Sequence, residues 1–283
     1  MAQPTDNSMP TMKVIAAGLP RCATTSLQAA LESPFLDIAP CMHGKQIFPR
    51  ADRMMLVLTA MRETDTARRR EILHQLFDGY AATVDIPGIF FVDDLMDMYP
   101  DASVILNVRP GPQDRRAASW AKSIRDALSF FTTWRYLLNN GLLKISRLHW
   151  RMHREIYHMF STHSRIQLLE GGGSGADWMT PEFYERYNAW VRAEAAKRGR
   201  KVLEFDPTMG WGPLCEFLGR NEKAVIPHEP FPHRNDAQQV AVIKRQVITL
   251  GLLLWTGAIA SVVLLFHMAL LVFNFASPFA KAQ

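Results

Sequence analysis

The sequence predicts an α/β fold, in which a mostly parallel sheet is flanked by helices, followed by a C-terminal transmembrane helix. Short apolar runs alternate with helical patterns through residues 13–206, which is typical of parallel strands joined by helices. The first run leads through a turn into a helix, the pattern of an anion-binding loop. Residues 247–273 carry no charged side chain, over a greater length than the roughly 20 residues that cross a bilayer core.

Five short runs of apolar and β-branched residues are predicted as strands: 13–18, 82–86, 103–109, 165–170 and 201–206. A helix is expected after Thr25, and a longer helical region from Asp126 to Phe160, broken near residues 139–141. Ligands of such folds bind at the carboxyl ends of the strands. We therefore look for a site at residues 18–21 and 85–88 and from Arg109 onward.

Composition limits the partners and the compartment. The chain has 283 residues and a formal net charge of +5, which suits an anionic ligand or an anionic membrane surface. Zinc-finger, RNP and basic-zipper patterns are absent, so a nucleic-acid partner is not expected. Three cysteines without a CxxC pair favour a reducing compartment and make a disulfide framework improbable. The sequence does not predict an oligomeric state.

The predicted organisation is linear, and neither a repeat nor a signal peptide is expected. A Gly-rich link at 170–178 and a Pro-rich stretch at 225–236 interrupt the chain. The predicted parts are a flexible N-terminus (1–12), an α/β domain (13–235), a juxtamembrane linker (236–246), a transmembrane helix (247–273) and a short tail (274–283).

The apolar segment 247–273 is interpreted as a single-pass C-terminal anchor. A buried core helix is the alternative, although buried helices of this length usually carry a polar stripe. Lys244 and Arg245 precede the segment, whereas Lys281 alone follows it. By the positive-inside tendency, the N-terminal domain is expected in the cytosol.

The loop "GLPRCATTS", residues 18–26, has the features of an anion site. A helix N-terminus directs backbone N–H groups and its dipole at one point, and Arg21 can fork onto phosphate or sulfate oxygens. Thr24 and Thr25 add hydroxyl donors; the alternative is a plain strand-to-helix turn with a threonine cap. GxGxxG is absent, and the triphosphate template would need glycine at Ala23 and lysine at Thr24.

These residues resemble the phosphosulfate-binding loop of sulfotransferases, roughly P-[KR]-[ST]-G-T-[TS]. Residues 12–235 as a whole resemble fungal sulfotransferase-like P-loop proteins. The stretches that carry this resemblance are "GLPRCATTSLQAALE", "PCMH", "VDIPGIFFVDDLMDMYPDASVILNVR", "SFFTTWRYLL", "RLHWRMH" and "VLEFDPTMGWGPLCEFLG". The resemblance implies a P-loop-type α/β fold that binds 3′-phosphoadenosine 5′-phosphosulfate (PAPS) and transfers its sulfuryl group to a small acceptor.

The resemblance also implies roles for single residues. Arg21 corresponds to the cation that touches the 5′-phosphate and the transferring group, and Arg109 to the arginine that holds the 3′-phosphate. Ser119 is expected to share that phosphate, with Ser123 as a second candidate. The implied nucleotide-binding residues are Gly18, Pro20, Arg21, Cys22, Ala23, Thr24, Thr25, Ser26, Arg109 and Ser119.

The expected catalytic residues are Asp85, Arg21 and His43. Asp85 stands where the resembling cytosolic enzymes have a basic histidine, and a carboxylate in a low-dielectric site can accept a hydroxyl proton. The alternative for Asp85 is a strand-end cap or a partner of Arg21. His43 is a secondary acid–base candidate. Asp93 and Asp94 are expected at solvated or capping positions of a helix.

Metal sites are not expected. Cys41 and His43 lack a third ligand at a suitable spacing. His149 and His153 lie one helical turn apart, a spacing that can bind zinc. However, the segment "RLHWRMHREIYH", which ends at His158, reads as an amphipathic basic helix, so a plain helix surface is expected there.

Three functions remain open from the sequence. The first is a membrane-anchored sulfotransferase that acts on a hydroxyl of a small, apolar acceptor. The second is a small-molecule P-loop kinase, for which Asp85 is the one strand-end acid that could hold magnesium. The third is a non-catalytic nucleotide-binding or scaffold protein, which Ala23 in place of the loop glycine and the stiffening Pro110 would suit.

Overall fold

A five-stranded, wholly parallel sheet forms the centre of the domain, which confirms the predicted fold class. The computed structural model describes residues 10–161, 165–169, 178–220, 229–234 and 236–280. The strands are β1 (Val14–Ala16), β2 (Cys41–Met42), β3 (Ala82–Val84), β4 (Ser103–Asn107) and β5 (Val202–Phe205). Their order across the sheet is β2-β3-β1-β4-β5.

Helices cover both faces of the sheet. Side chains alternate along a strand, so Val14 and Ala16 enter one apolar cluster with Leu27, while Ile15 enters the other with Trp120. The helices are α1 (Thr24–Leu31), α2 (Gly44–Ile47), α3 (Ala51–Arg62), α4 (Thr66–Phe77), α5 (Val92–Met98), α6 (Gln113–Leu128), α7 (Trp134–Asn140), α8 (Lys144–Phe160), α9 (Pro181–Lys197) and α10 (Trp211–Phe217). Short 3₁₀ turns are η1 (Gly88–Phe90), η2 (Ser129–Thr132) and η3 (Pro207–Met209).

Four of the observed strands match predicted runs, but β2 was not predicted. Residues 165–169 form no strand and make a single bridge, between Leu169 and Ser161; residue 170 lies outside the described residues. Ile166 and Leu168 are buried, so packing against the core explains the apolar run. The edge position belongs to β2, whose two residues are too few to produce a strand pattern.

The predicted break near residues 139–141 is confirmed, because α7 ends at Asn140 and α8 begins at Lys144. The hydroxyl of Thr133 accepts a 3.3 Å hydrogen bond from the Tyr136 N–H and starts α7. The helical region also extends further upstream than expected, because α6 begins at Gln113.

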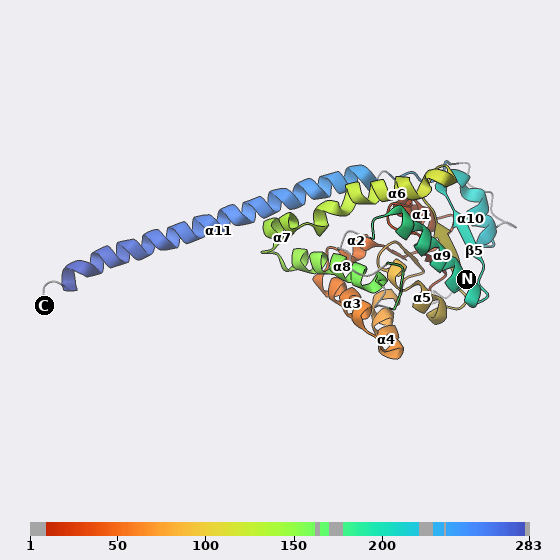
Figure 1. The fold of residues 1–283 in the computed structure, drawn as a ribbon, viewed down its shortest axis with the longest axis horizontal. Helices are drawn as coiled ribbons and strands as arrows, with labels where there is room; N and C mark the ends of the chain where they lie inside the picture. Colours follow the sequence, from red (N-terminus) through yellow and green to blue (C-terminus); the bar gives the residue numbers. More distant parts are fainter. Residues whose placement is uncertain (1–9, 162–164, 170–177, 221–228, 235, 281–283) are drawn as a thin grey trace, which may run out of the picture.

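The C-terminal helix α11 (Asp236–Ala280) runs without interruption through the residues predicted as linker and the apolar segment. Its first part lies beside α6 and α7, and the rest projects away from the domain (Figure 1). Residues Val240–Phe273 are long and apolar enough to cross a membrane, and almost none of that stretch is buried. The alternative of a buried core helix is therefore wrong.

Asp94 is not solvated, contrary to expectation. It is buried and accepts hydrogen bonds of 2.7 and 3.1 Å from Nε and Nη2 of Arg69, also buried. Arg165 lies 2.6 Å from Asp93 and 3.1 Å from Asp94. Because a buried charge must be paired, these side chains form a structural ion-pair network.

Candidate active site

The predicted site residues gather at the carboxyl edge of the sheet. His43 follows β2, Asp85 follows β3, the loop 17–23 follows β1, and Arg109 lies just beyond β4. Parallel strands end at the same edge, so positions far apart in the sequence become neighbours.

Asn107, at the end of β4, holds the loop in place. Its Oδ1 accepts a 2.9 Å hydrogen bond from the Gly18 N–H, and its Nδ2 donates a 3.0 Å bond to the Cys22 carbonyl. A Cβ atom on Gly18 would lie only 2.1 Å from the Asn107 carbonyl oxygen, so this position requires glycine. Asn107 was not among the site residues predicted from the sequence; the one signal for it is a polar residue at the end of a buried strand.

Two non-glycine residues of the loop have left-handed backbones. Arg21 has φ 72° and Ala23 has φ 56°. Ala23 therefore keeps the left-handed conformation for which glycine is favoured, at a cost of about 1–2 kcal/mol. It directly precedes α1, whose first N–H groups have no acceptors within the helix and carry its positive dipole end.

Two arginines meet at this loop: Arg21 belongs to it, and Arg109 lies beside it. An Nη atom of Arg109 donates a 2.6 Å hydrogen bond to the Arg21 carbonyl, and Nε of Arg21 donates a 3.2 Å bond to the Ser123 hydroxyl. Within the described part of the chain, neither arginine has a carboxylate at ion-pair distance. Burial, together with repulsion from Arg21, lowers the pKa of Arg109. A bound anion would offset both effects.

Each of the two serine candidates contacts one of these arginines. The exposed Ser119 accepts a 3.3 Å hydrogen bond from Nε of Arg109, whereas Ser123 is bonded to Arg21 and lines the cavity beside it. The geometry thus adds Ser123 to the site.

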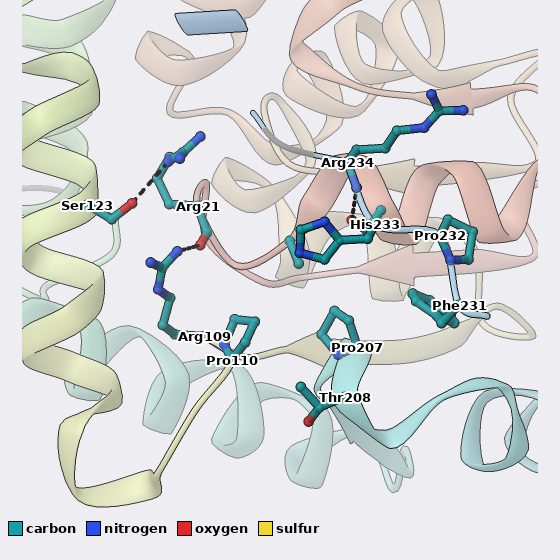
Figure 2. A pocket seen from close by; sticks show the side chains of 12 residues that line it. Arg21, Arg109, Pro110, Ser123, Pro207, Thr208, Phe231, Pro232, His233 and Arg234 are labelled. Atoms are coloured by element: carbon teal, nitrogen blue, oxygen red, sulfur yellow. Dashed lines mark hydrogen bonds between the residues drawn. The ribbon is translucent and has the colours of Figure 1, made fainter. Parts of the chain in front are cut away.

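A cavity of about 550 Å³ opens beside the two arginines, a size typical of small-molecule sites. Residues 231–234 form its far wall; they belong to a strap, residues 229–234, within the Pro-rich stretch noted at 225–236. The Arg234 N–H donates a 3.0 Å bond to Ser26 of α1, and Phe231 packs on Phe205 and Trp211. Figure 2 shows Arg21, Arg109 and Ser123 together on one side and His233 on the strap. The cavity walls also include Ala23, Pro110, Pro207, Thr208 and Pro232.

Asp85 and His43 form the second half of the site. Oδ2 of Asp85 lies 3.3 Å from Nε2 of His43 and accepts a 3.3 Å bond from the Thr24 hydroxyl. Its Oδ1 accepts a 2.8 Å bond from the Ile86 N–H. The pair is largely shielded from solvent, with side chains 13% and 8% exposed. Asp85 does not form an ion pair with Arg21, which was one alternative.

The orientation of His43 follows from its backbone contacts. It caps α2, and its Nδ1 accepts a 3.3 Å hydrogen bond from the Lys45 N–H. With Nδ1 acting as the acceptor, the neutral ring carries its proton on Nε2, which faces Asp85.

His149 and His153 do not form a plain helix surface. His153 is buried, neither of its ring nitrogens is hydrogen-bonded to a described residue, and the two rings lie 4.8 Å apart. His149 contacts Phe48, Phe131 and the Tyr136 hydroxyl, at 3.2 Å. Burial lowers the pKa of His149 to about 4 and that of His153 well below its usual range, so both are neutral at pH 7.

The described cysteines are free and buried. Burial raises the pKa of the Cys22 thiol, so Cys22 contributes its backbone to the loop rather than a thiolate. Among the described residues, no group of three or more His, Cys, Asp or Glu side chains is placed to hold a metal ion.

Comparison with known proteins extends this description. Residues 13–240 match the family described as "Sulfotransferase domain". The chain is also 31% identical over 230 residues to "Ava biosynthesis cluster protein M" of Aspergillus versicolor, an alignment that covers 78% of this chain and 80% of that protein.

Proposed function

Because the chain belongs to the sulfotransferase domain family, and is therefore a transferase, we propose that it moves a sulfuryl group from PAPS to a hydroxyl of a small, apolar acceptor. The observation that carries this proposal is the pair Arg21 and Arg109, which lack carboxylate partners among the described residues and lie beside one helix N-terminus and one cavity.

The donor side fits a nucleotide with two separate anionic groups. The backbone N–H groups at the start of α1 and the guanidinium of Arg21 would hold the 5′-phosphosulfate. Arg109, with Ser119 and Ser123 nearby, would hold the 3′-phosphate. Gly18 supports this assignment, because its missing side chain lets the loop approach Asn107 closely.

Bound PAPS would supply an activated sulfuryl group with adenosine 3′,5′-bisphosphate as its leaving group. The residues of the chain would align this group with the acceptor and neutralise charge that develops on the leaving oxygen. Arg21 would perform the second task, and its position beside the helix start supports this role.

On the acceptor side, Asp85 would take the hydroxyl proton as the new oxygen–sulfur bond forms and the bond to the bisphosphate breaks. His43 would orient Asp85 from 3.3 Å. The Thr24 hydroxyl links the donor and acceptor sides, because its single O–H group donates a hydrogen bond to Asp85. To donate to the sulfuryl group instead, Thr24 would first have to break its hydrogen bond to the Asp85 carboxylate.

Two observations support the proposed acceptor class. The relative's name associates it with a biosynthesis cluster, which supports a small-molecule acceptor. The apolar helix α11 supports anchoring in a membrane, with the domain on the cytosolic side. An apolar acceptor would concentrate in that membrane, close to the anchored domain.

The full-length protein, purified in detergent, tests the proposal by transfer of labelled sulfate from PAPS to a panel of phenols and apolar alcohols. We expect transfer by the wild type and loss of bisphosphate binding in Arg21→Ala. Label transferred instead from ATP would establish the kinase alternative. Bisphosphate binding without turnover across the panel would establish the non-catalytic alternative, and unchanged bisphosphate affinity in Arg21→Ala would refute the assigned site.

A further inference from the structure

One surface of the domain outside α11 carries neighbouring exposed apolar side chains. Trp134, Leu138 and Leu142 recur every four residues along α7 and the turn after it, and are 67%, 59% and 48% exposed. We name these three residues the α7 surface. The other large exposed apolar side chains described before α11, Met55 and Met209, lie on separate elements.

The α7 surface adjoins the part of α11 that begins the apolar segment. The Trp255 indole N–H donates a 2.8 Å hydrogen bond to the Leu138 carbonyl, and Nδ2 of Asn139 donates a 3.2 Å bond to the Ile248 carbonyl. Between them, a Cβ atom on Gly251 would lie 2.2 Å from that Nδ2 atom, so the two helices are in direct contact. The depth of α11 in a bilayer therefore determines the depth of α7 relative to the bilayer surface.

The length of the apolar segment 247–273 indicates the depth of α11 in the bilayer. At about 1.5 Å per residue, Val247–Phe273 is about 40 Å long, whereas a hydrocarbon core is about 30 Å thick. With α11 along the bilayer normal, the excess of about 10 Å lies outside the core. Residues 256–273, which follow the Trp255 contact with α7, span about 27 Å, close to the core thickness. Residues 248–255, which pack on α7, then occupy the headgroup region.

The shape of the domain and its exposed cations agree with α7 lying at the headgroup region. The turn between α7 and α8 forms the tip of the domain on the side toward which α11 projects (Figure 1). Exposed cations lie at the same end: Lys144 starts α8, and the Arg135 guanidinium lies 5.9 Å from the Trp134 ring centre. Tryptophan beside arginine and lysine is the composition of membrane interfaces.

We infer that the α7 surface docks into the headgroup region of the bilayer that α11 crosses, giving the domain a second, interfacial membrane contact. This inference rests on the proposed anchoring by α11. Docking would hold the domain in one orientation, with the buried Tyr136 of α7, the half-buried His149 and the buried His153 behind the docked surface.

The test uses the full chain in phosphatidylcholine vesicles, with and without phosphatidylserine. A polarity-sensitive fluorophore is attached to single cysteines introduced by Leu142→Cys on the α7 surface, Leu264→Cys within the span and Met55→Cys on α3. The described native cysteines are buried, so labelling of the folded protein falls on the introduced one. Quenchers attached to lipid at shallow and deep positions report depth.

We expect a blue shift and shallow quenching at Leu142, deep quenching at Leu264, and neither at Met55. Deep quenching at Leu264 with a water-like signal at Leu142 would overturn the inference and leave the anchor intact. Water-like signals at both positions would refute the anchor and the inference with it.

A charge variant provides a second test. Trp134→Glu combined with Leu138→Glu should abolish shallow quenching at Leu142 while the signal at Leu264 stays unchanged. Both side chains are exposed, so the thermal midpoint in detergent should equal that of the wild type. Shallow quenching that persists in a variant with that unchanged midpoint would contradict the inference.

Discussion

Oδ2 of Asp85 lies 3.3 Å from Nε2 of His43, although the two residues follow different strands of the sheet, β3 and β2. The carboxylate also accepts hydrogen bonds from the Ile86 N–H and the Thr24 hydroxyl. In the proposed reaction, Asp85 would face the acceptor hydroxyl and His43 would orient Asp85.

Asp85→Asn should therefore lower sulfuryl transfer by about 10²- to 10⁴-fold, the usual contribution of a general base, with little change in bisphosphate affinity. His43→Asn should cost less, because asparagine can still cap α2. Transfer rates and calorimetric affinities on the same preparations check both. A greater loss in His43→Asn than in Asp85→Asn would reverse the two roles.

Arg109→Ala should weaken bisphosphate binding. A hydrogen bond to a charged group is worth about 1.5–3 kcal/mol, so a loss of roughly 10- to 150-fold is expected. Arg192→Ala is the matched control, because Arg192 pairs with Glu204 on the surface and should bind as the wild type does. Equal losses in both arginine variants, measured by calorimetry, would indicate a general charge effect instead of a site.

Ala23→Gly should stabilise the protein slightly and retain nucleotide binding. Glycine avoids the left-handed penalty of about 1–2 kcal/mol, and its greater freedom in the unfolded chain offsets about half of that gain. The same change at Ala29, in the right-handed interior of α1, should destabilise by about 1 kcal/mol. Thermal midpoints that moved in the same direction for both variants would contradict the role assigned to the backbone of Ala23.

The half-buried His149 and the buried His153 should make the protein less stable in acid. Their folded-state pKa values are lowered, so the unfolded chain binds more protons once the pH falls below about 6.5. Each histidine then lowers the free energy of unfolding by about 1.4 kcal/mol per pH unit, down to about pH 4 for His149.

Denaturant unfolding in detergent between pH 7 and 4 measures this slope. His149→Phe and His153→Phe should each reduce it, because phenylalanine fills a similar space without titrating. The exposed His158 on the same helix serves as control, and His158→Gln should keep the wild-type slope. An unchanged slope in both phenylalanine variants would show that other groups cause the acid sensitivity.

Local patterns were sufficient wherever one segment carried the information. The alternation of buried runs and helices predicted the parallel sheet, and the start of α1 predicted the loop because a strand, a turn and threonines are adjacent in the chain. Two elements could not be predicted from patterns. The apolar side chains in residues 165–169 pack against the core without forming a strand, and β2 is too short to show the alternation typical of a strand.

The fold class, the strand–turn–helix loop with Arg21 and the long apolar segment could be predicted, because each depends on residues that are close together in the chain. The side chains that meet across strands became known from the three-dimensional structure. It placed Asn107 between Gly18 and Cys22, His43 against Asp85, the strap with Arg234 on Ser26, and α11 along α7. The physical reason is that these contacts join segments far apart in the chain, and the side-chain period of neither segment records its partner.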